Sequence, residues 1–338
     1  MLAPLLLAAV LQDPPAPAPA AEPLVVAHRG ASGLLPEHTL EAVAAAHALG
    51  ADYLEADAVL TSDGVPVVLH DIYLDATTNV AAVFPGRAVP GAPPGRRFRV
   101  FDFSLEEVKR LKARERVDPA TGRPVFPRRF PVGAAAFEVP TLAEELALVR
   151  GLNRSARRGP GAGAGVMVEL KDPAAHRAAG LDLAPAVLRV LGAAGYEDRG
   201  DRCYVQCFDI AELRRVRGEL GSDLKLLRLT RAGERLTDED LAATAELCAA
   251  VGPPLRDCLR FRNYLYESTG LIERAAAAGL AVFPYTARAD ALPAAAQDAA
   301  GFYILHEAAL GAGAAGLFTD HPGRTAAAFA RYRARFGR

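Results

Sequence analysis

Short apolar runs alternate with amphipathic segments along most of the chain, and this pattern predicts strands followed by helices. Strands are expected at residues 24–27, 53–59, 66–69, 166–171, 203–207, 224–229, 249–252, 281–285 and 316–318. Helices are expected at residues 39–50, 104–113, 141–152, 181–191, 211–217, 238–248, 264–278 and 302–310. The repeated strand-then-helix order predicts an α/β fold in which a parallel sheet closes as a TIM-type (β/α)8 barrel.

Local capping residues support several of these boundaries. Thr39 is a candidate N-cap, Gly50 is placed to end the same helix, and Ser104 with Glu107 forms a capping-box pattern. Residues 81–138 are rich in proline, glycine and arginine, which predicts a loop-rich insertion with one helical segment.

Composition and charge exclude some classes of protein. With 338 residues and 51% hydrophobic content, the chain can bury a large core, and residues 22–338 are expected to form one barrel domain. A net charge of −1 predicts neither a nucleic-acid surface nor a polybasic membrane anchor.

Residues 1–21 have the pattern of a leader. The apolar stretch Leu2 to Leu11 is too short to span a bilayer, and a Pro/Ala run with small residues suited to cleavage follows it. This predicts a signal peptide and export to the periplasm or the medium. Because no Lys or Arg precedes the apolar stretch, a disordered Ala/Pro tail on a cytoplasmic enzyme is the alternative. No other stretch is long and apolar enough for a membrane helix.

The four cysteines show no metal-ligand spacing. Cys203 and Cys207 lie on one predicted strand, where residues four apart are separated by roughly 13 Å and cannot bridge each other. Cys248 with Cys258 is the one pairing that remains to be tested as a disulfide.

The first candidate chemistry lies in the strands at the start of the chain. Glu55 and Asp57 are two residues apart on a strand, so their side chains face the same way, roughly 6 to 7 Å apart along the backbone. Two carboxylates this close repel each other unless a cation lies between them or one stays protonated, which favours a metal site. His28 and His70 each follow an apolar strand, and Arg29 is next to His28. Such a set suits chemistry on a phosphate.

Short segments of the chain also form an ordered set of motifs. They are His28-Arg29-Gly30, Pro36-Glu37-His38-Thr39, Gly50 to Asp57, Thr61-Ser62-Asp63-Gly64, Val67 to Asp71, Val139 to Leu142, Glu169-Leu170-Lys171, Gln206 to Asp209, Pro284-Tyr285-Thr286 and Gly316 to Asp320. Any one of them is weak, but the ordered set is specific and spans nearly the whole chain after the leader. In these motifs the chain resembles the glycerophosphodiester phosphodiesterases, most closely the long-chain form exported to the bacterial periplasm.

The resemblance implies a metal site made by Glu55, Asp57 and Glu169, which match the family's carboxylate ligands. Oxygen ligands without a thiolate or imidazole favour a hard divalent cation such as Ca²⁺ or Mg²⁺ over Zn²⁺. Ca²⁺ is favoured over Mg²⁺ by the resemblance to the exported form alone. The resemblance also implies that the insertion at residues 81–138 covers the barrel mouth.

By the same resemblance, His28 and His70 are the catalytic pair, one acting as general acid and the other as general base. The sequence leaves open which is which. His38 lies where the family usually has asparagine and is expected to be a loop hydrogen-bonding residue. The other four histidines carry no motif and are expected to be surface or helix residues: His47, His176, His306 and His321.

Arg29 and Lys171 are expected to bind the phosphate, through planar bidentate donors and a compact charge respectively. Phe208 and Tyr285 are expected to shape the pocket for the glycerol or the leaving alcohol, with core packing as the alternative. Four arginines of the insertion could meet an anionic substrate, but they are expected to be solvated surface residues: Arg96, Arg97, Arg128 and Arg129.

The resemblance implies metal-dependent hydrolysis of glycerophosphodiesters, such as glycerophosphocholine or glycerophosphoethanolamine, to glycerol 3-phosphate and an alcohol. The neighbouring glycerol hydroxyl is the expected nucleophile, because a tethered group has a proximity advantage. Two alternatives stay open. A phospholipase D-like enzyme acting on lysophospholipid or sphingomyelin predicts an exposed apolar rim. A catalytically silent binding protein predicts the loss of a histidine or a metal carboxylate, and none is lost here.

Overall fold

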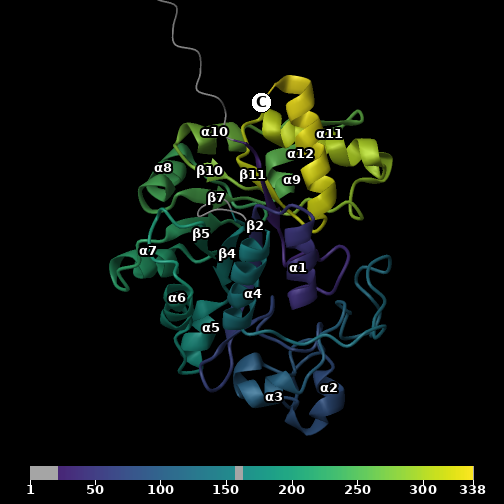
Figure 1. The fold of residues 1–338 in the computed structure, drawn as a ribbon, viewed down its shortest axis with the longest axis vertical. Helices are drawn as coiled ribbons and strands as arrows, with labels where there is room; N and C mark the ends of the chain where they lie inside the picture. Colours follow the sequence, from purple (N-terminus) through teal and green to yellow (C-terminus); the bar gives the residue numbers. More distant parts are fainter. Residues whose placement is uncertain (1–21, 157–162, 338) are drawn as a thin grey trace, which may run out of the picture.

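The computed structural model describes residues 22–156 and 163–337, so the predicted leader lies outside the described residues. Eight parallel strands form a barrel in the order β10-β7-β6-β5-β4-β2-β1-β11 (Figure 1). Their bounds are β1 Leu24–Ala27, β2 Tyr53–Leu60, β4 Gly165–Leu170, β5 Cys203–Cys207, β6 Lys225–Leu229, β7 Ala250–Gly252, β10 Ala281–Val282 and β11 Gly316–Thr319. The predicted (β/α)8 barrel is confirmed.

The barrel closes between β10 and β11 through backbone hydrogen bonds that continue past the end of β10. Ala315 N donates to Val282 O at 2.9 Å, and Phe318 N donates to Pro284 O at 3.0 Å. Ala287 N then donates back to Phe318 O at 2.8 Å. Closure pairs the two strands that would otherwise be edges, which fixes the positions of the strand ends relative to one another.

Helices follow the strands and cover the outside of the barrel (Figure 1). They are α1 Leu40–Ala48, α4 Leu142–Ser155, α5 Pro173–Ala178, α6 Leu183–Ala193, α7 Ile210–Gly218, α8 Asp238–Leu247, α10 Leu271–Ala277, α11 Ala299–Gly311 and α12 Pro322–Phe336. The predicted cap is confirmed, because the Thr39 side chain accepts from Ala42 N. The sequence pattern missed α5 and α12.

Side chains that point into the barrel are apolar at the level of the strand centres. This layer contains Val26, Tyr53, Met167, Tyr204, Leu227, Ala250, Phe283 and Phe318. Because a strand alternates its faces, the residues two positions further along point into the same space, nearer the C-terminal ends. Those residues include His28, Glu55, Glu169, Gln206, Tyr285 and Asp320. The two-residue period of the strands therefore places a layer of polar side chains directly above a packed apolar layer.

One predicted strand is not part of the barrel. β3 Pro66–Val68 pairs antiparallel with the end of β2, with Ala58 opposite Val68. The tight turn at residues 61–65 returns the chain beside β2, whereas a parallel neighbour needs a crossover of about a dozen residues or more. His70 therefore follows a strand of a hairpin, whereas His28 follows a strand of the barrel.

The predicted helix at residues 264–278 is wrong in its first half. β8 Leu259–Arg262 and β9 Leu265–Ser268 form an antiparallel hairpin, and α10 begins only at Leu271. Asn263 and Tyr264 have φ of +48° and +62°, as a two-residue hairpin turn of type I′ requires.

The chain between β3 and α4 contains the predicted insertion and forms a lobe that Figure 1 shows at the bottom of the view, around α2 and α3. It contains short elements, α2 Val80–Val83, α3 Leu105–Lys109 and 3₁₀ turns at Pro85–Arg87 and Val100–Asp102. The lobe has its own buried core with Phe98, Phe103 and Leu111, which continues onto Val59 and Val67 of the β2–β3 hairpin. The predicted capping box is present at the start of α3. The insertion is loop-rich, yet it is packed.

All four cysteines are buried and free, so the Cys248 to Cys258 disulfide is not formed. In residues 22–156 and 163–337, no helix has the length and apolar character needed to cross a bilayer.

Three of the histidines without a motif are buried within helices rather than at the surface. His47, His176 and His306 are 7%, 0% and 0% exposed. His306 on α11 hydrogen-bonds Phe302 O at 2.6 Å and Thr325 Oγ1 at 3.0 Å. Burial lowers its pKa to about 4.

His306 should make the folded state less stable in mild acid. Its pKa is lowered in the folded state, so between about pH 6.5 and 4 only the unfolded chain takes up a proton, and stability falls as the pH falls. At pH 5 this effect is about 2 kcal/mol. Urea unfolding of the wild type and His306→Gln at pH 7.5 and 5 should show the wild type losing more stability. An equal loss in both proteins would contradict the assignment.

Candidate active site

A cavity of about 640 Å³ opens at the C-terminal ends of the barrel strands. Every residue predicted as part of the site lines it: His28, Arg29, Glu55, Asp57, His70, Glu169, Lys171, Phe208 and Tyr285. These side chains come from β1, β2, β4, β5, the β3 hairpin and the segment after β10. The fold thus brings together residues that are more than 250 positions apart in the chain.

Three carboxylates form the centre of the cavity. Glu55, Asp57 and Glu169 each offer an oxygen, and these oxygens lie within 4.8 Å of one another. Asp57 on β2 is directly opposite Glu169 on β4 in the sheet register. All three are buried, with exposed fractions of 2%, 1% and 6%.

The surroundings of the three acids shift their pKa values in different directions. Burial and the charge of Asp57 raise the pKa of Glu55 well above its usual value, and burial raises that of Glu169 to about 8. Burial acts in the same direction on Asp57, but Lys171 and a hydrogen bond from His38 hold its pKa well below its usual value. Asp57 Oδ1 is buried without a hydrogen bond in the described structure. This oxygen-only donor set fits a hard divalent cation.

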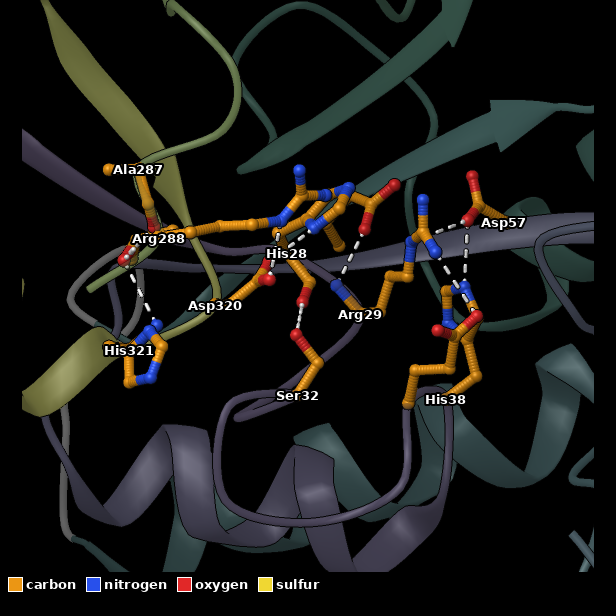
Figure 2. Close-up of polar contacts among 12 residues, drawn as sticks. His28, Arg29, Ser32, His38, Asp57, Ala287, Arg288, Asp320 and His321 are labelled. Carbon is orange, nitrogen blue, oxygen red and sulfur yellow. Dashed lines mark hydrogen bonds and ion pairs between the residues drawn. The ribbon is translucent and has the colours of Figure 1, made fainter. Parts of the chain in front are cut away.

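Two basic side chains border the carboxylates. Lys171 Nζ lies 2.8 Å from Glu169 Oε1 and 3.7 Å from Asp57 Oδ1. Arg29 places Nε 3.6 Å from Asp57 Oδ2, and its backbone N donates to Glu55 Oε2 at 2.7 Å (Figure 2). The two residues predicted to bind a phosphate therefore lie beside the proposed cation site.

A tight turn after β1 places His28 and Arg29 side by side at the cavity. Arg29 has a φ of +59°, and Gly30 follows with a φ of +77°. A Cβ atom on Gly30 would lie 2.7 Å from the backbone of Ala42 in α1, so a larger residue has no room there.

His28 is oriented by an aspartate from the neighbouring strand. Its Nδ1 lies 2.7 Å from Oδ1 of Asp320, which directly follows β11, as Figure 2 shows. Burial and the positive charge of Arg29 lower the pKa of His28 to about 3. The ring is therefore neutral near pH 7, and Nδ1–H donating to the carboxylate leaves Nε2 as an acceptor.

His70, which follows β3, has a matching arrangement. Its Nδ1 lies 2.8 Å from Oδ1 of the adjacent Asp71. Burial, then the charges of Arg29 and Lys171, lower its pKa to about 4. Each histidine thus has one nitrogen held by an aspartate and the other available for proton transfer.

The predicted hydrogen-bonding role of His38 is confirmed, and its partner is a metal-cluster residue. His38 Nε2 lies 2.7 Å from Asp57 Oδ2. Gln206 on β5 donates similarly to Glu55 Oε1 at 3.1 Å. Sequence reasoning missed Gln206 and Asp320 as site residues. Both lie in motifs and two positions after an inward apolar residue, so the strand alternation could have identified them.

The prediction that four arginines of the insertion are solvated is wrong for Arg129. Its side chain is 4% exposed and pairs with Asp290 at 2.8 Å and Asp320 at 2.7 Å. Two carboxylates offset the cost of burying the guanidinium. Arg96 and Arg128 are exposed, whereas Arg97 is partly buried, with Nε 3.5 Å from Asp75 Oδ1.

Phe208 and Tyr285 form an aromatic wall next to Lys171. Their ring centroids are 6.1 Å apart at 89°, and Tyr285 Oη donates to Thr230 O at 2.7 Å. The Lys171 ammonium lies 5.8 Å from the centre of the Phe208 ring. Both rings line the cavity and also pack on the barrel core, so they have both the pocket position and the core packing that were expected as alternatives.

Part of the cavity lining is apolar. It is formed by Leu255, Leu259, Phe261, Tyr266, Leu292 and Leu305, many of them from the β8–β9 hairpin and its surroundings. At the tip of this hairpin Tyr264 and Leu265 are 72% and 57% exposed. The cavity lining therefore combines charged and apolar side chains.

Comparisons with known proteins agree with this arrangement. A family model described as the glycerophosphoryl diester phosphodiesterase family matches residues 28–324. The glycerophosphodiester phosphodiesterase of Haemophilus influenzae is 35% identical over 332 residues, covering 88% of this chain and 87% of its own. A solved structure from Silicibacter pomeroyi, assigned to the glycerophosphoryl diester phosphodiesterases, is 28% identical with a TM-score of 0.69, covering 93% of this chain and 95% of its own.

A phosphodiesterase from Oleispira antarctica shares the fold with a TM-score of 0.61 at 20% identity, covering 91% of this chain and 97% of its own. That protein was solved in complex with sn-glycerol-3-phosphate.

A divalent cation should stabilise the metal-stripped protein through the three carboxylates. A ligand that binds only the native state at 100 times its Kd adds about 2.7 kcal/mol, which thermal unfolding resolves as a higher Tm. Asp57→Asn should lose this response. Glu212→Gln, which removes a buried carboxylate of α7 outside the cluster, should keep it. An unchanged response in Asp57→Asn would place the cation elsewhere.

Proposed function

The chain belongs to the glycerophosphoryl diester phosphodiesterase family, and from this we propose that it hydrolyses glycerophosphodiesters, such as glycerophosphocholine, to glycerol 3-phosphate and an alcohol. The observation that carries the proposal is one cavity holding three clustered carboxylates and two aspartate-bound histidines. The activity of the Haemophilus influenzae relative and the glycerol 3-phosphate bound by the Oleispira antarctica protein support it.

Glu55, Asp57 and Glu169 would hold the cation, with Ca²⁺ as the first choice and Mg²⁺ as the second. A bound divalent cation polarises a phosphoryl oxygen and offsets the charge that develops on it. Arg29 and Lys171 border the same place and would bind the non-bridging oxygens of the phosphate.

The two histidines divide the proton transfers. The Nε2 atom of one accepts the proton of the glycerol hydroxyl next to the phosphate. The other ring first takes up a proton from water at Nε2, which a phosphate bound beside it favours, and delivers that proton to the leaving alkoxide. The attacking hydroxyl is already tethered to the phosphorus it attacks, so the protein needs only to orient it. The resulting cyclic phosphate is then opened by water, with the histidines exchanging roles.

Export rests on residues 1–21, which lie outside the described residues, and it remains a prediction. The silent-protein alternative has no support, because the cavity assembles both histidines and all three carboxylates.

Removal of either histidine should abolish turnover without unfolding the protein. His28→Ala and His70→Ala should each lower kcat by roughly 10² to 10⁴-fold, the usual contribution of general acid–base catalysis. Release of glycerol 3-phosphate from glycerophosphocholine measures this, with Ca²⁺, Mg²⁺ or Zn²⁺ added back to metal-stripped enzyme. His47→Gln, on the outside of the barrel, should retain activity. Full turnover in a site variant would remove that histidine from the mechanism.

A second substrate class is favoured by the apolar part of the cavity lining. A glycerophosphodiester without an acyl chain has nothing to bury against Leu255, Phe261 or Leu292. A lysophospholipid would place its phosphate beside Arg29 and Lys171 and its acyl chain against these apolar residues. The exposed tip of the β8–β9 hairpin, Tyr264 and Leu265, supplies the apolar rim that a phospholipase D-like activity predicts.

Phe261 should discriminate between these two substrate classes. Losing apolar contact worth about 1.5 to 3 kcal/mol should raise KM for lysophosphatidylcholine by roughly 10-fold or more in Phe261→Ser. Turnover of glycerophosphocholine should not change. Choline release from both substrates gives the comparison. If the wild type does not hydrolyse lysophosphatidylcholine, the second candidate is rejected and the first stands.

A further inference from the structure

The aspartate behind each histidine uses its two oxygens in the same way. Asp71 presents Oδ1 to His70 at 2.8 Å and Oδ2 to Arg116 Nη1 at 2.7 Å. Asp320 presents Oδ1 to His28 at 2.7 Å and Oδ2 to Arg129 Nη2 at 2.7 Å. Both arginines belong to the insertion at residues 81–138 rather than to the barrel.

Arg116 is fixed from two directions. Besides Asp71, its Nη2 and Nε donate to the two oxygens of Glu37 at 2.7 and 3.0 Å, and its side chain is 17% exposed. Glu37 also accepts from Arg29 Nη1 at 3.1 Å. Arg116 therefore connects the hairpin that carries His70 to the loop that follows β1.

Arg129 is held in the same manner on the other side. It donates to both oxygens of Asp290 at 2.8 and 3.1 Å and to Ser32 O at 3.2 Å. Its guanidinium also lies 3.7 Å from the centre of the Phe126 ring. Arg288 Nε also donates to Asp320 Oδ2, at 2.8 Å, and Figure 2 shows Arg288 and His28 at the same aspartate.

The chain carrying these arginines is itself fixed to the protein. Val117 N donates to Ala76 O at 3.0 Å, and Arg114 N donates to Thr77 O at 2.8 Å. Neither Arg116 nor Arg129 is among the described residues that line the cavity. Their contacts lead to the histidines through the aspartates and not to the space that the substrate occupies.

An aspartate that binds only a histidine can rotate and carry the ring with it. An arginine on the second oxygen restricts that rotation, and on Asp320 it shares this role with Arg288. A displacement of about 1 Å in a catalytic group can lower the rate by roughly 10²-fold. Fixing both rings therefore has a direct consequence for turnover.

We propose that Arg116 and Arg129 are positioning residues, which act through Asp71 and Asp320 to fix the ring orientations of His70 and His28. The insertion then completes the geometry of the acid–base pair. The proposal rests on the proposed hydrolysis of glycerophosphodiesters.

The test compares Arg116→Ala and Arg129→Ala on two esters of glycerol 3-phosphate that differ in leaving group. Choline needs a proton to leave, whereas p-nitrophenolate leaves well without one. We expect kcat for glycerophosphocholine to fall roughly 10- to 100-fold in both variants, with KM within about 3-fold. On the p-nitrophenyl ester, the variant that misplaces the general acid should recover most of its loss. The variant that misplaces the base should recover none.

Arg99→Ala is the matched control, since Arg99 is an exposed arginine of the insertion paired with Asp102 only at the surface. Site variants that match this control on both esters would overturn the proposal. Equal losses on both esters in both variants would also overturn it, because a general disturbance has no leaving-group dependence.

If the arginine variants do not fold, Asp71→Asn and Asp320→Asn replace them. Each keeps an oxygen that can accept from the histidine Nδ1–H but loses the charge that pairs with the arginine. The same split between the two esters is expected, and its absence rejects the proposal. A wild-type enzyme that cleaves neither ester would instead refute the proposed function.

Discussion

The structure of the site depends on one electrostatic constraint, which is that three carboxylates are buried within 4.8 Å of one another. Such a cluster is unfavourable unless positive charge is supplied and the acids are held firmly in place. The barrel meets the second requirement, because the register of β2 and β4 sets Asp57 opposite Glu169. Lys171 meets part of the first, and the rest is consistent with a divalent cation. Both sources of charge would also attract an anionic phosphate.

Charge alternates outward from this cluster. The acids are bordered by Arg29 and Lys171, and Arg29 in turn contacts Glu37, which Arg116 also binds. The positive charges nearest the histidines, together with burial, keep both rings neutral near pH 7. A neutral ring with an aspartate on Nδ1 can accept a proton at Nε2. The network that surrounds the acids therefore also favours the protonation state that the general base requires.

Much of the site follows from local rules that the sequence displays. The period of two along a strand predicts that Glu55 shares a face with Asp57, and that Glu169 shares one with Lys171. The closed barrel then brings these faces together. What the sequence does not display is pairing over long separations. Nothing near Arg129 indicates that Asp320, 191 positions away, will bury it.

The β8–β9 hairpin was not predicted for a related reason. The two-residue turn that begins at Asn263 is a weak sequence signal, and the residues after it also suit a helix. The antiparallel pairing of the strand before His70 was also missed, because an apolar strand has the same sequence pattern whether its neighbour is parallel or antiparallel.

The residues proposed to carry out the reaction and those proposed to select the substrate lie in different parts of the chain. The carboxylates, Lys171 and His28 stand on or directly after barrel strands, whose positions closure fixes. The apolar wall comes from the connections between β7 and β11, including the β8–β9 hairpin. A change in this hairpin alters what the leaving or acyl group meets without moving an acid or a histidine. The insertion is different, because its arginines contact the aspartates of both histidines. Substitution in the hairpin should therefore change which ester is cleaved, whereas substitution at Arg116 or Arg129 should change the proton transfers that cleavage requires.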